Sequence, residues 1–261
     1  MKLYCEVAGN GPDLVFLHGW GMHSGLWTTI ASALTDRYRV TLIDLPGHGF
    51  SERYDTSISL TDLAECLADL LPRPCSLAGW SLGGLAALQL AMIHPEQIEQ
   101  IVLVTSSACF VKQAGWPNAM EQKVLADFHR RLEQEPDATL QRFVALQTFG
   151  SPEPQTLARL ILKRLRDRTP ADTRALLDGF NMLLHSDLRQ SLSKLRCPVS
   201  LLLGSHDRIV PPGVGADMQR LLPAIRCYLF ERGGHIPFLS HRHEFITALE
   251  DHITPGDHIN G

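Results

Sequence analysis

The sequence predicts an α/β fold in which a mostly parallel, doubly wound sheet carries an inserted helical cap. Short β-rich runs recur along the chain, and most are apolar without alternation, as expected for parallel strands covered on both faces. Helical patterns separate these runs, and alternating strands and helices are typical of a doubly wound sheet. One long interval, from Thr105 to Val199, contains helical patterns alone, and it predicts the insertion.

The elements follow in order. Six runs are predicted to be strands, namely 13–18, 40–45, 75–80, 101–106, 199–204 and 227–230. The stretch SLTDLAECLADLL places Leu60, Leu63 and Leu67 on one face of a helix, with Thr61 as one possible capping residue. A second helix, SLGGLAALQLAMIHP, directly follows the third strand and ends near Pro95.

Four helix-like stretches without a strand follow the fourth predicted strand. They cover residues 121–133, 138–147, 155–166 and 172–184. Ordinary crossover helices are the alternative, but four in succession favour an insertion. We therefore predict a core formed by residues 1–109 and 186–261 and a helical cap formed by residues 110–185.

Composition excludes several classes of function. The chain has 261 residues, 44% of them hydrophobic, which is enough for one large core. Its net charge of -4 gives no electrostatic basis for binding nucleic acid. No apolar run approaches the roughly 20 residues of a membrane span, and the first ten residues lack the apolar segment of a signal peptide. Six scattered cysteines without a C-x-x-C pair indicate reduced thiols. We expect a soluble, cytoplasmic monomer.

The stretch LAGWSLGGLAA predicts a nucleophile at Ser81. This serine lies between a predicted strand and a predicted helix, with Gly79 and Gly83 two residues away on either side. A sharp strand-to-helix turn strains the corner residue, and flanking glycines let the strand and the helix approach each other. Free N–H groups at the start of the helix favour negative charge beside the exposed serine oxygen. A structural turn is the alternative, since G-x-S-x-G alone is weak evidence.

A serine nucleophile needs a base, and the base needs an orienting acid. Asp207 follows the fifth predicted strand, and His235 lies in a glycine-rich loop after the sixth. Both positions are at carboxyl ends of strands, where α/β sheets build their sites, and the chain order is serine, acid, histidine. Asp44 is the alternative acid. We expect His18 to shape a turn.

Two backbone amides complete the predicted site as an oxyanion hole. The N–H of Leu82 follows the nucleophile, and the N–H of Trp20 comes from the loop after the first predicted strand. The Trp20 ring either walls the pocket or packs in the core. The chemistry of these groups requires no metal and no organic cofactor.

The motifs HGW, DLPGHGFS, GWSLGG, GSHDRIVP and GGHIPF resemble those of the α/β-hydrolase superfamily. The tryptophans of LHGWGM and AGWSLGG, with RFVALQTFGS and HIPFLSH, resemble those of the biotin-pathway esterases that cleave the methyl ester of pimeloyl-acyl carrier protein. The resemblance implies an α/β-hydrolase fold and a serine carboxylesterase that releases methanol. The alternatives are a general short-chain carboxylesterase without a carrier partner, or a small-molecule receptor on the same fold.

The resemblance also implies roles for residues of the predicted cap. It implies an acyl channel lined by Phe143, Val144, Ala145, Leu146 and Gln147. Packing of the cap on the core is the alternative role for these residues. The substrate-binding set then also includes Trp20, Ser81, Leu82 and His235.

The predicted cap is basic, whereas the rest of the chain is acidic. Residues 110–185 contain 11 Lys and Arg against 9 Asp and Glu, net +2, and the remainder contains 13 against 19, net -6. Arg159 and Lys163 share one helix face, and Arg142 lies on the preceding helix. With the resemblance, these three residues are predicted to dock an acidic acyl carrier protein; a solvated basic face is the alternative. Two other arginine positions of the family hold Ala138 and Gln155. The residues that would compensate are Arg164, Arg166 or Arg168.

Overall fold

The computed structural model describes residues 1–253 and contains one seven-stranded sheet. Its strands are β1 (Cys5–Ala8), β2 (Asp13–Leu17), β3 (Arg39–Ile43), β4 (Cys75–Trp80), β5 (Ile98–Val104), β6 (Val199–Gly204) and β7 (Arg226–Phe230). They lie in the order β1-β3-β2-β4-β5-β6-β7, and every neighbouring pair is parallel except β1 with β3. The mostly parallel, doubly wound sheet is therefore confirmed. Strand β1 is missing from the prediction because it is an exposed edge strand without an apolar run.

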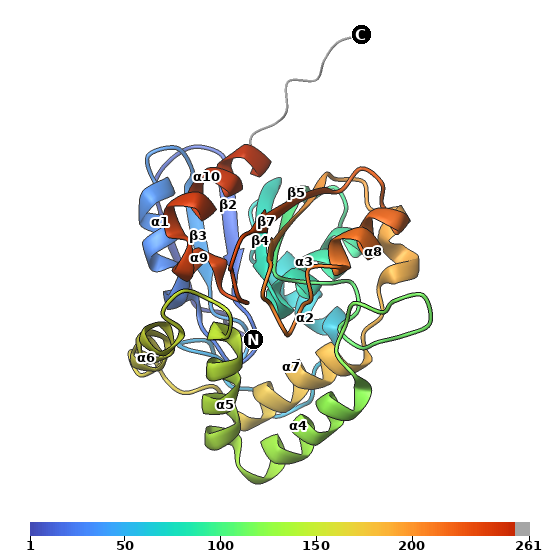
Figure 1. The fold of residues 1–261 in the computed structure, drawn as a ribbon. Helices are drawn as coiled ribbons and strands as arrows, with labels where there is room; N and C mark the ends of the chain where they lie inside the picture. The colour runs from blue at the N-terminus through green and yellow to red at the C-terminus, as the bar shows by residue number, and fades with distance from the viewer. Residues whose placement is uncertain (254–261) are drawn as a thin grey trace.

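Helices cover both faces of this sheet (Figure 1). They are α1 (Thr28–Leu34), α2 (Leu60–Ala68), α3 (Leu82–Ile93), α8 (Val214–Leu221), α9 (Pro237–Ser240) and α10 (Arg242–Ile253). Helices α1 and α10 lie on one side, and α2, α3 and α8 lie on the other (Figure 1). None of the helices within residues 1–253 is long and apolar enough to cross a membrane.

The cap of α2 differs from the predicted one. Ser59, rather than Thr61, precedes the helix, and its hydroxyl accepts a hydrogen bond from the Asp62 N–H. The Asp62 carboxylate accepts in turn from the Ser59 N–H at 2.8 Å. This reciprocal pair is a capping box, so Thr61 already lies inside the first turn.

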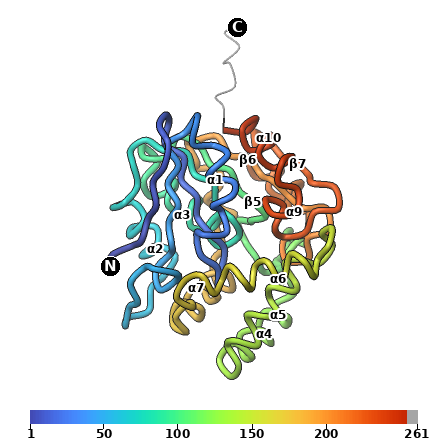
Figure 2. The backbone as a smooth tube through the Cα atoms, turned by 90° about the vertical axis from the view of Figure 1, so that its left-hand side faces the viewer, coloured from blue at the N-terminus to red at the C-terminus, as the bar shows by residue number. Residues whose placement is uncertain are grey.

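The inserted helices lie together at one end of the sheet, where Figures 1 and 2 both place them. They are α4 (Gln122–Gln134), α5 (Pro136–Thr148), α6 (Pro154–Leu165) and α7 (Thr173–His185). Between β5 and β6, a part of the chain that is described throughout, isolated bridges occur but no strand. The last residues of the predicted core, 254–261, lie outside the described part of the chain.

The start of α3 lies very close to the ends of β2 and β4. A methyl group added at Gly83 would lie 2.6 Å from the carbonyl oxygen of Leu17 and 2.7 Å from that of His18. One added at Gly79 would lie 2.6 Å from the Gly83 oxygen. Since real Cβ atoms do not approach backbone so closely, glycine at both positions permits the turn that carries Ser81.

Replacing Gly83 with alanine is expected to destabilise the protein by more than about 2 kcal/mol, because rigid backbone occupies the space of the new methyl group. The matched control is Gly215→Ala in α8, where the methyl would lie 3.2 Å from the Leu203 Cδ1 and 3.5 Å from the Cys227 Sγ, both side-chain atoms rather than backbone. Alanine also favours a helix by about 1 kcal/mol, so we expect a small change there. Urea unfolding followed by circular dichroism measures the free energy of unfolding of both variants. Similar losses of stability in the two would contradict the close approach of α3 to the ends of β2 and β4.

Candidate active site

Ser81 adopts a strained backbone conformation, with φ 53° and ψ -114°. Its N–H donates to the Val104 carbonyl at 3.0 Å, and its own carbonyl accepts from the Ser106 hydroxyl at 2.7 Å. These bonds hold the corner against the end of β5. Such strain costs about 1–3 kcal/mol and persists only where the surroundings over-determine it. The side chain is buried, with 2% of the residue exposed.

Asp207 and His235 form a buried pair. The Nδ1 of His235 lies 2.7 Å from Oδ2 of Asp207, and because a carboxylate only accepts, Nδ1 carries the proton. The other carboxylate oxygen accepts from the N–H groups of Ile209 and Val210 at 2.8 and 3.0 Å. The Nε2 of His235 is buried and has no hydrogen-bond partner among the described residues. The ring is thus oriented by Asp207, with Nε2 available to a reacting group.

The loop that carries His235 is held on two sides. On the core side, Trp80 Nε1 and the Thr105 hydroxyl each donate to the His235 carbonyl at 2.9 Å. On the other side, the His235 N–H donates to the Gln147 carbonyl at 3.1 Å. The C-terminal end of α5 therefore positions this loop. Such a contact cannot be predicted from the sequence, because hydrogen bonds between backbone groups leave no residue pattern.

The loop after β2 reaches the nucleophile. A methyl group at Gly19 would lie 3.3 Å from the Ser81 Cβ, so the backbone of this loop lies against the serine. Trp20 is 1% exposed; its Nε1 donates to the Leu176 carbonyl at 2.7 Å, and its ring packs edge-on against Phe143. Within residues 1–253, neither the Trp20 N–H nor the Leu82 N–H donates to another protein atom. Both N–H groups predicted to form the oxyanion hole are therefore free to donate to a ligand.

His18 shapes this loop through both ring nitrogens. The Leu45 N–H donates to Nε2 at 2.9 Å, so Nδ1 carries the proton and donates to the Gly19 carbonyl at 2.8 Å. Complete burial lowers the pKa of His18 to about 3. The neighbouring His48, whose ring lies 5.2 Å away, adds to the shift. The imidazole is neutral at physiological pH.

Asp44, the alternative acid, lies in a different environment. It is fully buried, and its Oδ2 lies 2.7 Å from Nη1 of Arg168. Its carboxylate accepts hydrogen bonds from this arginine and from backbone N–H groups, including that of Ser24, and it makes no hydrogen bond with His235. The structure therefore brings Asp207, and not Asp44, to the histidine.

An apolar cavity of about 30 Å³ lies above Ser81. Its lining residues are Trp20, Ser81, Phe110, Met120, Leu125, Phe128, Phe143, Leu146, Phe180, Leu183 and Ile209. The volume holds one or two water molecules, so an acyl chain fits only when the lining side chains move apart. None of these side chains is charged.

Two residues of the predicted acyl channel line this cavity. Phe143 and Leu146 are three positions apart on α5 and share its inner face. Val144 and Gln147 are buried outside the lining, and Ala145 is exposed. Phe128 and Phe180, aromatic residues of the other inserted helices, also line the cavity. Neither is among the predicted site residues, although the amphipathic pattern of those helices marks their apolar faces.

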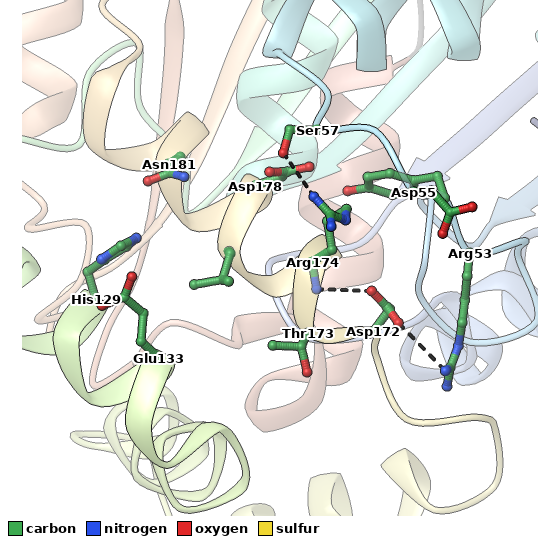
Figure 3. Close-up of a pocket in the computed structure, with 12 residues that line it drawn as sticks. Arg53, Asp55, Ser57, His129, Glu133, Asp172, Thr173, Arg174, Asp178 and Asn181 are labelled. Atoms are coloured by element: carbon green, nitrogen blue, oxygen red, sulfur yellow. Dashed lines mark hydrogen bonds and ion pairs between the residues drawn. The ribbon is translucent and has the colours of Figure 1, made fainter.

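A larger, polar cavity of about 660 Å³ lies elsewhere, along the outer face of α7 (Figure 3). Two of its arginines are engaged locally: Arg53 lies 3.6 Å from the Asp172 carboxylate, and Arg174 donates to the Ser57 hydroxyl at 3.4 Å. None of the predicted site residues lines it. Size therefore does not identify the reactive site here.

The three predicted docking residues lie on exposed faces of the inserted helices. Arg142 on α5 is 3.7 Å from the Glu135 carboxylate, with 55% of its side chain exposed. Arg159 and Lys163 are exposed on α6. Two of the three residues expected to compensate are engaged internally. Arg164 donates to the Gly25 carbonyl at 2.9 Å, and the Arg168 side chain is only 7% exposed.

Residues 14–248 match the Alpha/beta hydrolase family, and the chain belongs to that family. Within it, the chain belongs with the pimeloyl-[acyl-carrier protein] methyl ester esterases. It is 41% identical to that of Nitrosomonas europaea over 250 residues, covering 95% of this chain and 98% of the relative. It is 40% identical to that of Aeromonas hydrophila over 254 residues, covering 97% and 100%.

A solved esterase from Exiguobacterium antarcticum shares the fold, with a TM-score of 0.88 at 24% identity, covering 96% of this chain and 94% of that one. These comparisons confirm the predicted α/β-hydrolase fold and the hydrolase class. They also confirm the resemblance to the pimeloyl-[acyl-carrier protein] methyl ester esterases.

The stability of the protein is expected to fall as the pH drops below about 6.5, the ordinary pKa of histidine. His18 has a pKa of about 3 in the native state, so between these two pH values the unfolded chain binds the additional proton. Stability therefore rises with pH across this window, by about 1.4 kcal/mol per pH unit for this residue.

Urea unfolding at several pH values tests this slope. His18→Gln is expected to show a shallower dependence than wild type, whereas His243→Gln, at an exposed position on α10, should keep the wild-type slope. An unchanged slope in His18→Gln would show that this imidazole is not the group that titrates on unfolding.

Proposed function

We propose that this protein is a serine carboxylesterase that hydrolyses the methyl ester of pimeloyl-acyl carrier protein and releases methanol, in the cytoplasm and within biotin biosynthesis. The observation that carries the proposal is Ser81 beneath a cavity without a charged side chain. A methyl ester is neutral and suits such a cavity, whereas a free carboxylate loses its hydration there. The 41% identity to an esterase named for this substrate supports the same choice.

The proposed reaction begins with Ser81. Its hydroxyl attacks the ester carbonyl while Nε2 of His235 takes the proton, and Asp207 stabilises the imidazolium that results. The N–H groups of Trp20 and Leu82 donate hydrogen bonds to the oxyanion. Each such donor typically stabilises the transition state by about 3–4 kcal/mol. The bonds that hold the His235 carbonyl and N–H keep the base in place during this transfer.

His235 then protonates the methoxide as it leaves, and methanol departs. A water molecule, deprotonated by the same nitrogen, attacks the acyl-enzyme carbonyl, and His235 then gives that proton to the Ser81 oxygen as its bond to the acyl group breaks. The product carries a carboxylate in an apolar cavity, which favours its release. No metal and no organic cofactor takes part in this proposal.

Residues 110–185 act, in this proposal, as a cap that opens to admit the acyl chain. Of the helices that line the cavity, α4 is best suited to move, because it buries only Leu125 and Leu132 whereas α5 and α7 each bury more residues. Phe128 on this helix closes the cavity through ring contacts with Trp20 and Phe143, at centroid distances of 5.6 and 5.7 Å. Such contacts break without leaving a polar group unpaired.

Replacing Ser81 with alanine is expected to leave the fold intact and to reduce hydrolysis of a nitrophenyl ester to below a few per cent of wild type, since no other group forms the acyl-enzyme. The matched control is Ser32→Ala on the exposed face of α1, which should retain full activity. Initial rates and circular dichroism measure both. Substantial activity in Ser81→Ala would place the nucleophile elsewhere.

Carrier docking is proposed for Arg142, Arg159 and Lys163, which act on encounter rather than on chemistry. Reversing Arg142 and Arg159 to Glu is expected to raise KM for the carrier-bound ester and to leave a small free ester nearly unaffected. High salt should slow wild type on the carrier-bound ester alone, because it screens charges beyond about 8–10 Å.

The control for this pair is Lys194→Glu with Arg196→Glu, an equal change in charge at exposed positions of the core. Equal losses on both esters would mean that the arginines stabilise the cap. If wild type showed no preference for the carrier-bound ester, the protein would be a general carboxylesterase instead.

A further inference from the structure

Arg168 is buried although it lies in the linker between α6 and α7. Its side chain is 7% exposed, and its guanidinium carbon lies 5.1 Å from the ring centre of Tyr4 and 5.0 Å from that of Phe50. A buried guanidinium is costly unless it is paired and hydrogen-bonded. The arginine therefore marks a built contact between the inserted helices and the core.

Its main partner is the Asp44 carboxylate, at the end of β3. Nη1 of Arg168 donates to both Asp44 oxygens, at 2.8 and 2.7 Å. One of these oxygens also accepts from the Ser24 N–H at 2.8 Å, and the other from the Phe50 N–H at 2.9 Å. Gly49, with φ +55°, leaves the space that this carboxylate fills.

The same guanidinium nitrogen donates to the Ser24 hydroxyl at 2.8 Å. Ser24 is the last residue of the segment 18–24, which we call the oxyanion loop. His18 fixes the other end of this loop through the Leu45 N–H. Between the two ends, the Gly19 backbone lies against Ser81, and the Trp20 N–H is uncommitted. The position of that amide relative to the nucleophile therefore depends on how both ends are held.

We propose that Arg168 is a positioning residue for catalysis: acting through Asp44 and Ser24, it holds the oxyanion loop so that the Trp20 N–H meets the developing oxyanion. The inference rests on the role proposed for Trp20 and goes beyond it. It couples the inserted helices to the chemistry, because the oxyanion hole is complete only when the α6–α7 linker is seated on the core. A tether that only adds stability is the competing explanation.

A transition-state analogue separates positioning from stability. A trifluoromethyl ketone adds to Ser81 and places an oxyanion in the hole, so its affinity reports the alignment of the Trp20 N–H. Arg168→Met is expected to lower kcat for a nitrophenyl ester by about 10- to 100-fold, with KM nearly unchanged, and to weaken the ketone by a similar factor. Arg168→Lys, which keeps the charge, should restore part of both.

Ser24→Ala removes only the hydroxyl contact and keeps the N–H bond to Asp44, so it remains informative if Arg168→Met does not fold. We expect it to lower kcat and ketone affinity together, by about 3- to 10-fold. The matched control is Arg242→Met, an exposed arginine at the start of α10, which should behave as wild type towards both compounds.

The proposal is overturned if Ser24→Ala and the folded Arg168 variants lose thermal stability but keep wild-type kcat and ketone affinity, since Arg168 would then be a tether. It is also overturned if kcat falls while ketone affinity does not change. Failure of wild type to hydrolyse the ester would instead contradict the proposed function, so the two failures are distinct.

Discussion

The close contact between the start of α3 and the ends of β2 and β4 is the constraint on which this site depends. Backbone meets backbone there, with no room for a Cβ at Gly79 or Gly83. The contact forces Ser81 into its positive-φ conformation, which is maintained by the hydrogen bond that Ser81 donates to Val104 and the one it accepts from Ser106. The same contact brings the loop after β2 beside the serine. The packing of α3 against β2 and β4 therefore positions both the nucleophile and the oxyanion loop.

The polar groups that serve this site are kept out of the cavity. Asp207, Asp44 and His18 are buried, and each is satisfied by backbone N–H groups or by a charged partner. The surface presented to a ligand is consequently apolar apart from the serine. Such a cavity discriminates by charge: it accepts an esterified acid and disfavours the free acid. This preference accords with an enzyme that removes a methyl ester from a dicarboxylic chain.

Much of the architecture can be predicted from the sequence, because apolar runs mark buried strands and because 3.6-residue periodicity marks the inserted helices. Strand β1 cannot be predicted in this way, since this exposed edge strand carries no apolar run. The residues of the predicted triad can be placed from their positions at strand ends together with their chain order, and two of them, Asp207 and His235, do lie in contact.

Destinations of individual side chains are harder to predict. Arg168 and Arg159 are the same residue type, yet the Arg168 side chain is buried against Asp44 and Arg159 is exposed on α6. Similarly, Phe143 lines the cavity while its neighbour Val144 does not, because successive residues of a helix point in different directions. The packing of α5, α6 and α7 on the core determines which face of each helix is buried and which is exposed.

The most direct measurement is intact-mass spectrometry of acyl carrier protein that bears a pimeloyl methyl ester, before and after incubation with the purified protein. We expect the carrier to lose the mass of one CH₂ group, as methyl is replaced by hydrogen, and the thioester to remain. Loss of the whole acyl group, or no change under conditions in which a nitrophenyl ester is hydrolysed, would contradict the proposed methyl esterase activity.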